Sequence, residues 1–186
     1  MSDTGELRTD RLVLQPLNMS DHAALLAHWT NPQVREFLFD GYTLSTAEIT
    51  ETIMASQRTF AYAGYGIWAL RTAARHASVD SRLLGTPLVG TAGLRRLVED
   101  DEDSEIEIVY SLDPACWGHG YAAEAAEAVL RHAFETVGLE RVIAEIDEGN
   151  TTSAALAERL GMRPYETVPG QLGPMTHYVI SSGSGG

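Results

Sequence analysis

The segment Trp117-Gly118-His119-Gly120-Tyr121-Ala122 constrains this chain most, because a helix-forming run follows it at once. The run from Ala122 to Phe134 contains neither glycine nor proline and is rich in the strongest helix formers. Two glycines separated by one residue let the backbone approach a ligand without a Cβ in the way. The helix start adds unpaired N–H groups and the positive end of its dipole. The segment therefore predicts a turn that binds a phosphate-carrying molecule, pyrophosphate above all.

Two phosphate-binding patterns are alternatives for this turn. The two glycines and Ala123 satisfy the loose dinucleotide-binding pattern, with Glu145 and Asp147 about 20 residues downstream to hold a ribose. Against it, the predicted strand Ile106–Leu112 does not run directly into Gly118, and too little chain follows for the remaining strands and helices of that fold. A P-loop is excluded because no Gly-Lys-Ser/Thr follows the glycines.

The segments around the turn supply a second pattern. Thr9-Asp10-Arg11-Leu12 stands near the N-terminus, and a predicted strand ends in Ser111-Leu112-Asp113-Pro114 before the turn. Arg141–Asp147 is a further predicted strand, and Asn150-Thr151-Thr152-Ser153-Ala154 opens a helix that ends in Leu160-Gly161-Met162-Arg163. From about Leu7 to Ile180 this ordered set resembles the GNAT superfamily of acyl-CoA-dependent N-acyltransferases, in particular the branch that acetylates ribosomal-protein N-termini. The resemblance implies an α/β (α+β) fold, a mixed, mostly antiparallel sheet that splits in a V and is flanked by helices.

The resemblance also implies that acetyl-CoA is the co-substrate and that the reaction needs no metal. It further implies which residues bind acetyl-CoA. The backbone amides of the turn would surround the pyrophosphate, and the residues carried over to this role are Trp117, Gly118, His119, Gly120, Tyr121 and Ala122. The family often has Arg or Gln where this chain has Ala115, which removes one side-chain contact and leaves the amides. The strand Glu107–Leu112 would offer its backbone to the pantetheine arm, so Tyr110 and Leu112 join the predicted cofactor-binding set. For the Trp117 ring, packing at the helix entrance and contact with the cofactor are equal alternatives.

Asn150 and Ser153 form the second predicted site. Asn150 precedes a predicted helix, so its side chain can cap the first turn, with Ser153 three residues in. The resemblance implies that Asn150 contacts the pantetheine and that Ser153 lies near the departing thiolate. Many relatives have a Tyr four residues before Gly161 that protonates the thiolate, and this chain has Ala157 there. Ser153 or water must then supply that proton, and a purely capping role of Asn150 remains an equal alternative.

Glu107 is the predicted catalytic base. In the alternating segment Glu105–Val109 the glutamates point to one face of a strand and the isoleucines to the other. A carboxylate that faces a cleft beside the thioester accepts the amine proton directly or through water. The alternative is that Glu105 and Glu107 line a solvated face. The remaining aromatic side chains considered, interpreted as structural, are Tyr110, Tyr165 and Tyr178.

Length and composition limit the remaining options. With 186 residues the chain suffices for one sizeable core, so we predict a single domain over residues 1–186, with a core at about 7–180 and a flexible tail at 181–186. No apolar run is long enough to span a membrane, and the polar, acidic N-terminus is unlike a secretory signal. The net charge of −13 disfavours nucleic acid and is compatible with a cationic amine. A single cysteine, Cys116, indicates a reducing cytoplasm. The six histidines lack metal-ligand spacing, so no metal is predicted.

Periodicity and chain breakers predict the other elements. Further strands are expected at Arg11–Leu17, Gly66–Thr72, Leu88–Leu97 and Met175–Ile180, the last closing the sheet. Helices are expected at Asp21–Thr30, capped by Ser20, and at Ser45–Ala61, where Ser45 and Glu48 form a capping box. A loop or short helix is expected at Val34–Gly41, and loops at Ala73–Gly85 and Pro164–Pro174. The acidic turn Val98–Asp103 is interpreted as a solvated hairpin tip, with an acceptor-binding patch as the alternative. The aromatic residues interpreted as core, with an acceptor pocket as the alternative, are Phe37, Phe39, Tyr42 and Trp68.

The sequence thus predicts a cytoplasmic enzyme that transfers acetyl from acetyl-CoA to a primary amine by direct attack. The alternative is a non-catalytic module of the same fold that holds CoA or another nucleotide. A covalent route through Cys116 is disfavoured because this residue precedes the pyrophosphate turn. The predicted partner is an amine acceptor, either a small molecule or a protein N-terminus, and the sequence does not say which. A homodimer is carried as a further partner prediction, with no face assigned to it.

Overall fold

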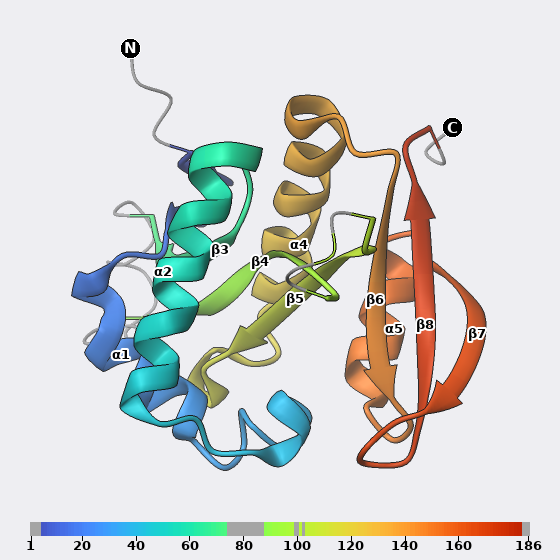
Figure 1. Ribbon diagram of the computed structural model, residues 1–186, viewed down its shortest axis with the longest axis horizontal. Coiled ribbons are helices and arrows are strands. Elements are labelled where there is room, and N and C mark those ends of the chain that lie inside the picture. The colour runs from blue at the N-terminus through green and yellow to red at the C-terminus, as the bar shows by residue number, and fades with distance from the viewer. Residues whose placement is uncertain (1–4, 74–87, 99–100, 102, 184–186) are drawn as a thin grey trace.

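A mixed sheet of eight strands organises the computed structural model, which describes residues 5–73, 88–98, 101 and 103–183 (Figure 1). Its strand order is β1-β2-β3-β4-β5-β6-β8-β7. The strands are β1 (Leu7–Arg8), β2 (Leu12–Pro16), β3 (Ile67–Thr72), β4 (Gly90–Arg96), β5 (Ile106–Leu112), β6 (Arg141–Asp147), β7 (Arg163–Pro169) and β8 (Pro174–Ser181). The α-helices are α1 (His22–Thr30), α2 (Thr46–Ala63), α4 (Tyr121–Arg131) and α5 (Thr151–Arg159). This is the predicted α/β class.

The junction of β5 and β6 divides the sheet. All other neighbouring strands are antiparallel, and β4 and β5 stay in register along their full length. β5 and β6 run parallel and share a single register pair, Glu107 with Ile143, near the start of both strands. Beyond this pair the two strands part. The predicted mixed, mostly antiparallel sheet with a V-shaped split is therefore confirmed.

Helices cover both faces of the sheet, two on each (Figure 1). The larger core cluster joins α4 and α5 to the strands through small side chains such as Ala125 and Ala157, which let the helices approach closely. The smaller cluster joins α1 and α2 to the opposite face through Leu25, Ile49 and Ile53. Because side chains alternate along a strand, Ile108 of β5 points into the larger cluster and Glu107 to the α1–α2 face.

The start of α2 follows the predicted local chemistry, whereas the start of α1 does not. Ser45 caps α2 and Glu48 returns the bond to the Ser45 backbone, so the predicted capping box is confirmed. The prediction that Ser20 caps α1 is wrong. A 3-10 turn over Met19–Asp21 precedes α1, and Asn18 caps that turn by accepting from the Ser20 N–H at 2.9 Å. Asn18, and not Ser20, therefore supplies the side-chain acceptor for a free backbone N–H group at the start of this segment.

The C-terminal hairpin differs from the prediction. Residues 163–169 form β7, although residues 164–169 were expected as part of a loop. β8 lies between β6 and β7, so Met175–Ile180 does not close the sheet. Nearly every β7 side chain is exposed, which removes the alternation of apolar and polar residues that announces a strand. Pro164 and Pro169 are tolerated because β7 is an edge strand.

Other expectations fall partly or wholly outside the described residues. The loop predicted at Ala73–Gly85 includes residues 74–85, and the acidic turn at Val98–Asp103 includes residues 99–100 and 102, none of which the structure describes. The tail beyond residue 183 is not described either. Among the helices of the described part of the chain, none is long and apolar enough to cross a membrane.

Candidate functional site

The turn before α4 has the backbone conformation that its glycines allow. Gly118 and Gly120 have φ values of 77° and 78°, and Gly120 is the N-cap of α4. Both values lie in the left-handed region, which residues with a Cβ rarely adopt. A Cβ at Gly118 would find no neighbouring atom within 4 Å, so the space in front of the turn is open.

The amides of this turn form a cradle for an anion. Within the described residues, the backbone N–H groups of Gly118, His119 and Gly120 donate to no acceptor. The first N–H group of α4 that bonds within the helix is that of Glu124, which donates to the Gly120 carbonyl at 3.1 Å. Several unsatisfied donors therefore gather at the positive end of a helix dipole, as pyrophosphate binding requires.

An ion pair from the N-terminal segment lies behind this turn. The Arg11 Nε donates to Glu124 Oε2 at 2.6 Å, and the Arg11 backbone N–H donates to Glu124 Oε1 at 2.8 Å. The Thr9 hydroxyl also donates to Glu124 Oε1. The Arg11 Nη1 reaches the turn itself and donates to the carbonyl of His119 at 2.8 Å. The guanidinium lies over the Tyr121 ring, 4.6 Å from its centroid.

The predicted pantetheine-binding residues lie where β5 separates from β6. Tyr110 donates from its hydroxyl to the Ser153 carbonyl at 3.4 Å, which links β5 to α5 across the split. Burial raises the pKa of Tyr110, opposed in part by this contact with Ser153, so its hydroxyl stays protonated at neutral pH. Trp117 is half exposed and donates from its indole Nε1 to the Leu112 carbonyl at 2.9 Å. The indole therefore ties the turn to the end of β5.

Asn150 caps α5 as predicted. Its Oδ1 accepts from the Ser153 N–H at 3.2 Å. Ala157, which stands where many relatives have a Tyr, is fully buried in the larger core cluster. A phenol at this position would have to leave the core.

Glu107 lies in the junction itself and is only 3% exposed. The interpretation that it lines a solvated face is therefore wrong. Arg95 of β4, its direct register partner, donates from Nε to Glu107 Oε1 at 2.5 Å. Glu105 is much more exposed and pairs with Arg141 at 3.1 Å. The two glutamates share a face of β5 but differ in burial and in partner.

Further ionisable groups lie on the same face of the sheet. His177 of β8 lies between two carboxylates, with Nε2 3.0 Å from Glu145 and Nδ1 3.1 Å from Glu166. His28 of α1 bonds through Nε2 to the Ser111 hydroxyl at 2.9 Å. Burial lowers the pKa of His28 from 6.5 to about 4, although the nearby Asp113 carboxylate and Ser111 oppose the shift. His28 is thus a neutral imidazole at physiological pH.

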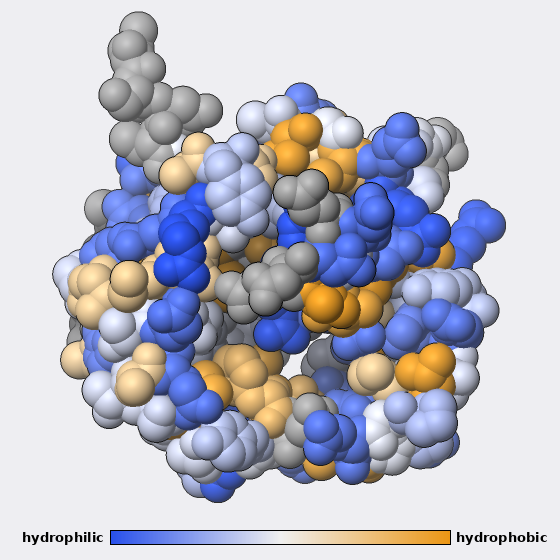
Figure 2. Space-filling model, in the orientation of Figure 1, coloured by the Kyte–Doolittle hydropathy of each residue, from blue (hydrophilic) through white to orange (hydrophobic). Residues whose placement is uncertain are grey.

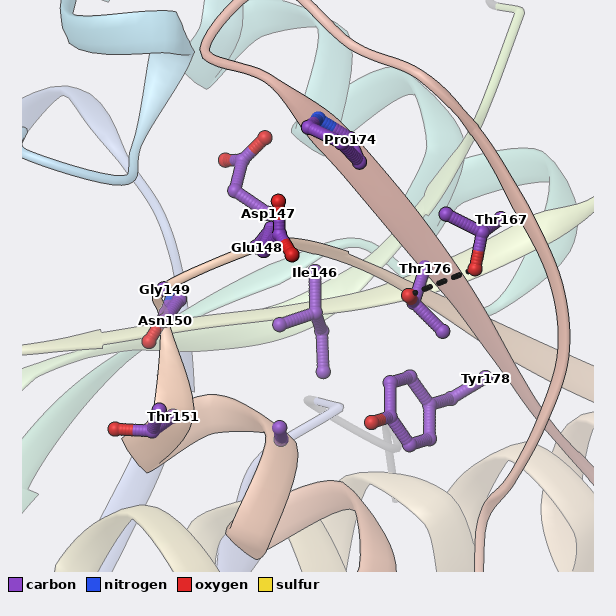
Figure 3. Close-up of a pocket in the computed structure, with 11 residues that line it drawn as sticks. Ile146, Asp147, Glu148, Gly149, Asn150, Thr151, Thr167, Pro174, Thr176 and Tyr178 are labelled. Atoms are coloured by element: carbon purple, nitrogen blue, oxygen red, sulfur yellow. Dashed lines mark hydrogen bonds between the residues drawn. The ribbon is translucent and has the colours of Figure 1, made fainter.

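Two concavities adjoin these residues. Figure 2 shows a hollow on the α1–α2 face, between the segment that joins these helices and the C-terminal strands. On the opposite side, between the start of α5 and strands β6, β7 and β8, lies a cavity of about 230 Å³ (Figure 3). Asn150 is the predicted site residue that lines this cavity, together with Asp147 and Thr176. Glu107 and the turn do not line it.

The comparisons with known proteins agree with this geometry. A sequence model of the GNAT acetyltransferase domain matches residues 11–163. The chain belongs to the GNAT acetyltransferase family. The uncharacterized N-acetyltransferase p20 of Bacillus licheniformis is 27% identical over 172 residues, which cover 89% of this chain and 90% of that protein. A solved GnaT-family acetyltransferase from Bordetella pertussis is 27% identical with a TM-score of 0.77, covering 95% of this chain and 99% of that chain.

The fold is also that of a CoA complex. A structure described as RimL, a ribosomal L7/L12 alpha-N-protein acetyltransferase in complex with coenzyme A, superposes with a TM-score of 0.72 at 15% identity, covering 95% of this chain and 97% of that chain. This GNAT acetyltransferase is an acyl-CoA-dependent enzyme. The alternative dinucleotide-binding fold is excluded by the mostly antiparallel sheet.

Sequence reasoning missed the partners of the predicted site residues. Arg95 can be identified as the partner of Glu107 only once the register of the β4–β5 hairpin is known. Arg11 and Glu124 are more than a hundred residues apart, and no local pattern joins them. Of the four aromatic residues interpreted as core, Trp68 is fully buried and Phe39 packs edge-on against Trp29, whereas Phe37 and Tyr42 are exposed.

Proposed function

We propose that this GNAT acetyltransferase transfers the acetyl group of acetyl-CoA directly to a primary amine, with Glu107 as the base. One observation carries the proposal: a cradle of free amides lies at the end of β5, and the same strand separates from β6 just beyond Glu107. A thioester whose pyrophosphate occupies the cradle and whose arm follows β5 has its reacting carbon near that carboxylate. Binding energy remote from the reaction then positions the reacting atoms.

The binding roles follow from the same geometry. The amides from Trp117 to Ala122 would bind the pyrophosphate, and the backbone of Tyr110 and Leu112 would face the pantetheine arm. Asn150 would contact that arm with its side-chain amide group while its oxygen caps α5. Among these groups, the amides of Gly118, His119 and Gly120 donate to no acceptor within the described residues, whereas the Trp117 amide donates to the Pro114 carbonyl at 3.3 Å.

An ammonium acceptor first releases one proton to solvent, and the acetyl transfer itself then requires two further proton transfers. The neutral amine attacks the thioester carbonyl, a C–N bond forms, and the C–S bond breaks to release the thiolate of CoA. Glu107 accepts the proton that the amine loses, directly or through water. Arg95 holds Oε1 of Glu107 and leaves Oε2 for this role. The thiolate takes up a proton from water, directly or through the Ser153 hydroxyl, which regains its own proton from water.

A direct attack also agrees with the position of the single cysteine. Cys116 is fully buried in the larger core cluster, in the 3-10 turn that precedes the cradle. A covalent route would require its thiol to leave the core and reach the thioester. We therefore propose no acyl-enzyme.

The acceptor face favours a cationic substrate. Four glutamates share the α1–α2 face of the split sheet with their partners Arg95, Arg141 and His177, and the whole chain carries a net charge of −13. The net negative charge of the protein raises the local concentration of ammonium groups. We propose a primary amine, on a small molecule or a protein N-terminus, as the acceptor.

The exchange of Glu107 tests the proposal. In Glu107→Gln we expect kcat to fall by roughly a hundredfold or more, because the side chain keeps its shape and loses its basicity. Glu105→Gln is the matched control, since Glu105 lies on the same face of the same strand. Thiol release with a panel of primary amines measures turnover, and calorimetric titration measures acetyl-CoA affinity.

The two measurements separate the parts of the proposal. Retained acetyl-CoA affinity with lost turnover in Glu107→Gln, and near-normal turnover in Glu105→Gln, would support Glu107 as the base. Unchanged turnover in Glu107→Gln would assign the base elsewhere. Absence of acetyl-CoA binding by the wild-type protein would contradict the cofactor assignment itself.

A further inference from the structure

We infer that Arg11 is a positioning residue for the pyrophosphate turn, which it holds from behind so that the Gly120 N–H faces the ligand. The inference rests on the proposed function, since it concerns how acetyl-CoA is bound. The other residues of this site lie more than a hundred positions further along the chain, so the inference gives the N-terminal segment a role in a site that is distant in sequence. Three features of the Arg11 environment carry it.

The first feature is the orientation of one peptide group. The Arg11 Nη1 donates to the His119 carbonyl at 2.8 Å. The carbonyl of His119 and the N–H of Gly120 belong to the same planar peptide, and in a trans peptide these two bonds point in opposite directions. By fixing the carbonyl toward itself, Arg11 fixes the Gly120 N–H away from itself. A flip of this peptide would present a carbonyl oxygen to the phosphate instead.

Glycine makes such a flip a real risk. Gly120 lacks a Cβ, and its backbone is free to rotate into several conformations of similar energy. The left-handed conformation with φ of 78° therefore needs external support. The Arg11 Nη2 lies 3.5 Å from the place where a Cβ of Gly120 would stand, so the guanidinium packs directly against this residue.

The second feature is the charge of Glu124. This carboxylate lies in the first turn of α4, close to the proposed position of the pyrophosphate. Burial works to raise the pKa of Glu124, but hydrogen bonds from Thr9 and Arg11 outweigh it and hold the pKa below its usual value, so the group is ionised. Arg11 neutralises this anion at 2.6 Å and removes its repulsion of a phosphate.

The third feature is that Arg11 is itself fixed in place. Its side chain bonds to Glu124 and His119 and stacks on Tyr121, and its backbone N–H also bonds to Glu124. A planar guanidinium serves these partners at once, which a lysine ammonium on a flexible stem does not. The turn is thus pre-organised before the ligand arrives, in a chain that has Ala115 where many relatives place a cationic or amide side chain.

Titration calorimetry with CoA tests the inference on the full-length protein. The variants are Arg11→Gln and Arg11→Lys, with Arg58→Gln as the matched control. Arg58 lies on the exposed face of α2, paired with Glu51 at 2.8 Å, so its exchange changes the net charge equally and leaves the turn untouched. We expect the dissociation constant of CoA to rise about tenfold or more in Arg11→Gln, because a hydrogen bond from a charged donor and a neutralising charge are both lost.

Two further readouts separate positioning from simple charge or stability. The Gly120 amide proton resonance should shift downfield when CoA binds to the wild type, and should fail to do so in Arg11→Gln. Arg11→Lys, which keeps the charge, should lose most of the affinity as well. The thermal midpoint of each variant without ligand verifies that it is folded, and Arg11→Lys remains available if Arg11→Gln is not.

The outcomes are distinguishable from a failure of the proposed function. If the wild type does not bind CoA, the proposed function fails. If the wild type binds CoA and Arg11→Gln binds it equally well, the role of Arg11 is overturned. If Arg11→Lys binds like the wild type, charge alone suffices and the positioning of the Gly120 peptide is overturned.

Discussion

At the scale of single residues, His28 shows how burial decides the chemistry of a side chain. The imidazole is only 5% exposed, and its Nδ1 has no hydrogen-bond partner among the described residues. A proton on this ring would be buried near the Asp113 carboxylate and the Ser111 backbone, and these two groups do not offset the lost hydration. The folded protein therefore keeps His28 neutral down to about pH 4.

This shift predicts a loss of stability in mild acid. The folded-state pKa of about 4 lies below the ordinary value of 6.5, so between these pH values the unfolded chain binds a proton that the folded protein refuses. Stability therefore falls as pH falls through this window, by about 2 kcal/mol between pH 7 and pH 5. Urea unfolding of the wild type and of His28→Gln at both pH values measures it. The variant should lack this part of the pH dependence, and equal pH dependence of the two proteins would refute the assignment.

The sequence identified Glu107 and the turn but not the residues that hold them. Glu107 follows from strict alternation along one strand, which is local information. Its ion pair with Arg95 depends on the register of two strands, and the contact of Arg11 with the turn depends on the whole fold. Candidate site residues were therefore nameable from local sequence alone, and their roles stay predictions, whereas their electrostatic partners were not predictable.

At the scale of elements, Asn150 joins a structural and a proposed chemical role on one side chain. Its oxygen caps α5, and its amide group is the part proposed to contact the pantetheine. Asn150→Ala should lower the free energy of unfolding by about 1 kcal/mol, because the Ser153 N–H loses its acceptor. Asn150→Asp keeps an oxygen cap and loses the amide donor.

The pair of variants separates the two roles. We expect Asn150→Asp to unfold near the wild-type temperature and to bind CoA several-fold more weakly, whereas Asn150→Ala should lose both stability and affinity. Thermal unfolding and calorimetric titration give the two values for each protein. Full CoA affinity in Asn150→Asp would mean that Asn150 is a cap and nothing more.

Elements with a local signal were predicted, and elements defined by their neighbours were not. The start of α4, the cap of α5 and the capping box of α2 depend on residues within one turn of each other. β7 carries no such signal, since it is exposed on both faces and gains its conformation from hydrogen bonds to β8. The short edge strand β1 was missed for the same reason, because it extends over two residues paired to β2.

At the scale of the whole molecule, the split divides the sheet into two units, and the strands within each unit are paired more extensively than the two units are with each other. β1 to β5 form one antiparallel unit with α4 against it, and β6, β8 and β7 form another with α5 against it. The single β5–β6 register pair, the larger core cluster and the Tyr110–Ser153 hydrogen bond connect them. A ligand arm between β5 and β6 would add contacts to both units at the place where the sheet supplies fewest.

This arrangement predicts that CoA stabilises both halves together. At a ligand concentration 100-fold above the dissociation constant, binding to the folded state adds about 2.7 kcal/mol to the free energy of unfolding. Amide hydrogen exchange should therefore slow in residues 108–112 of β5 and also in residues 144–147 of β6. Tyr110→Phe serves as a comparison variant, because it lacks the hydrogen bond to Ser153 that connects the two units before CoA binds. Because these segments belong to different units, protection confined to the first would mean that CoA contacts the turn alone. Equal protection on both sides would place the pantetheine arm within the split, where the base proposed for the reaction lies.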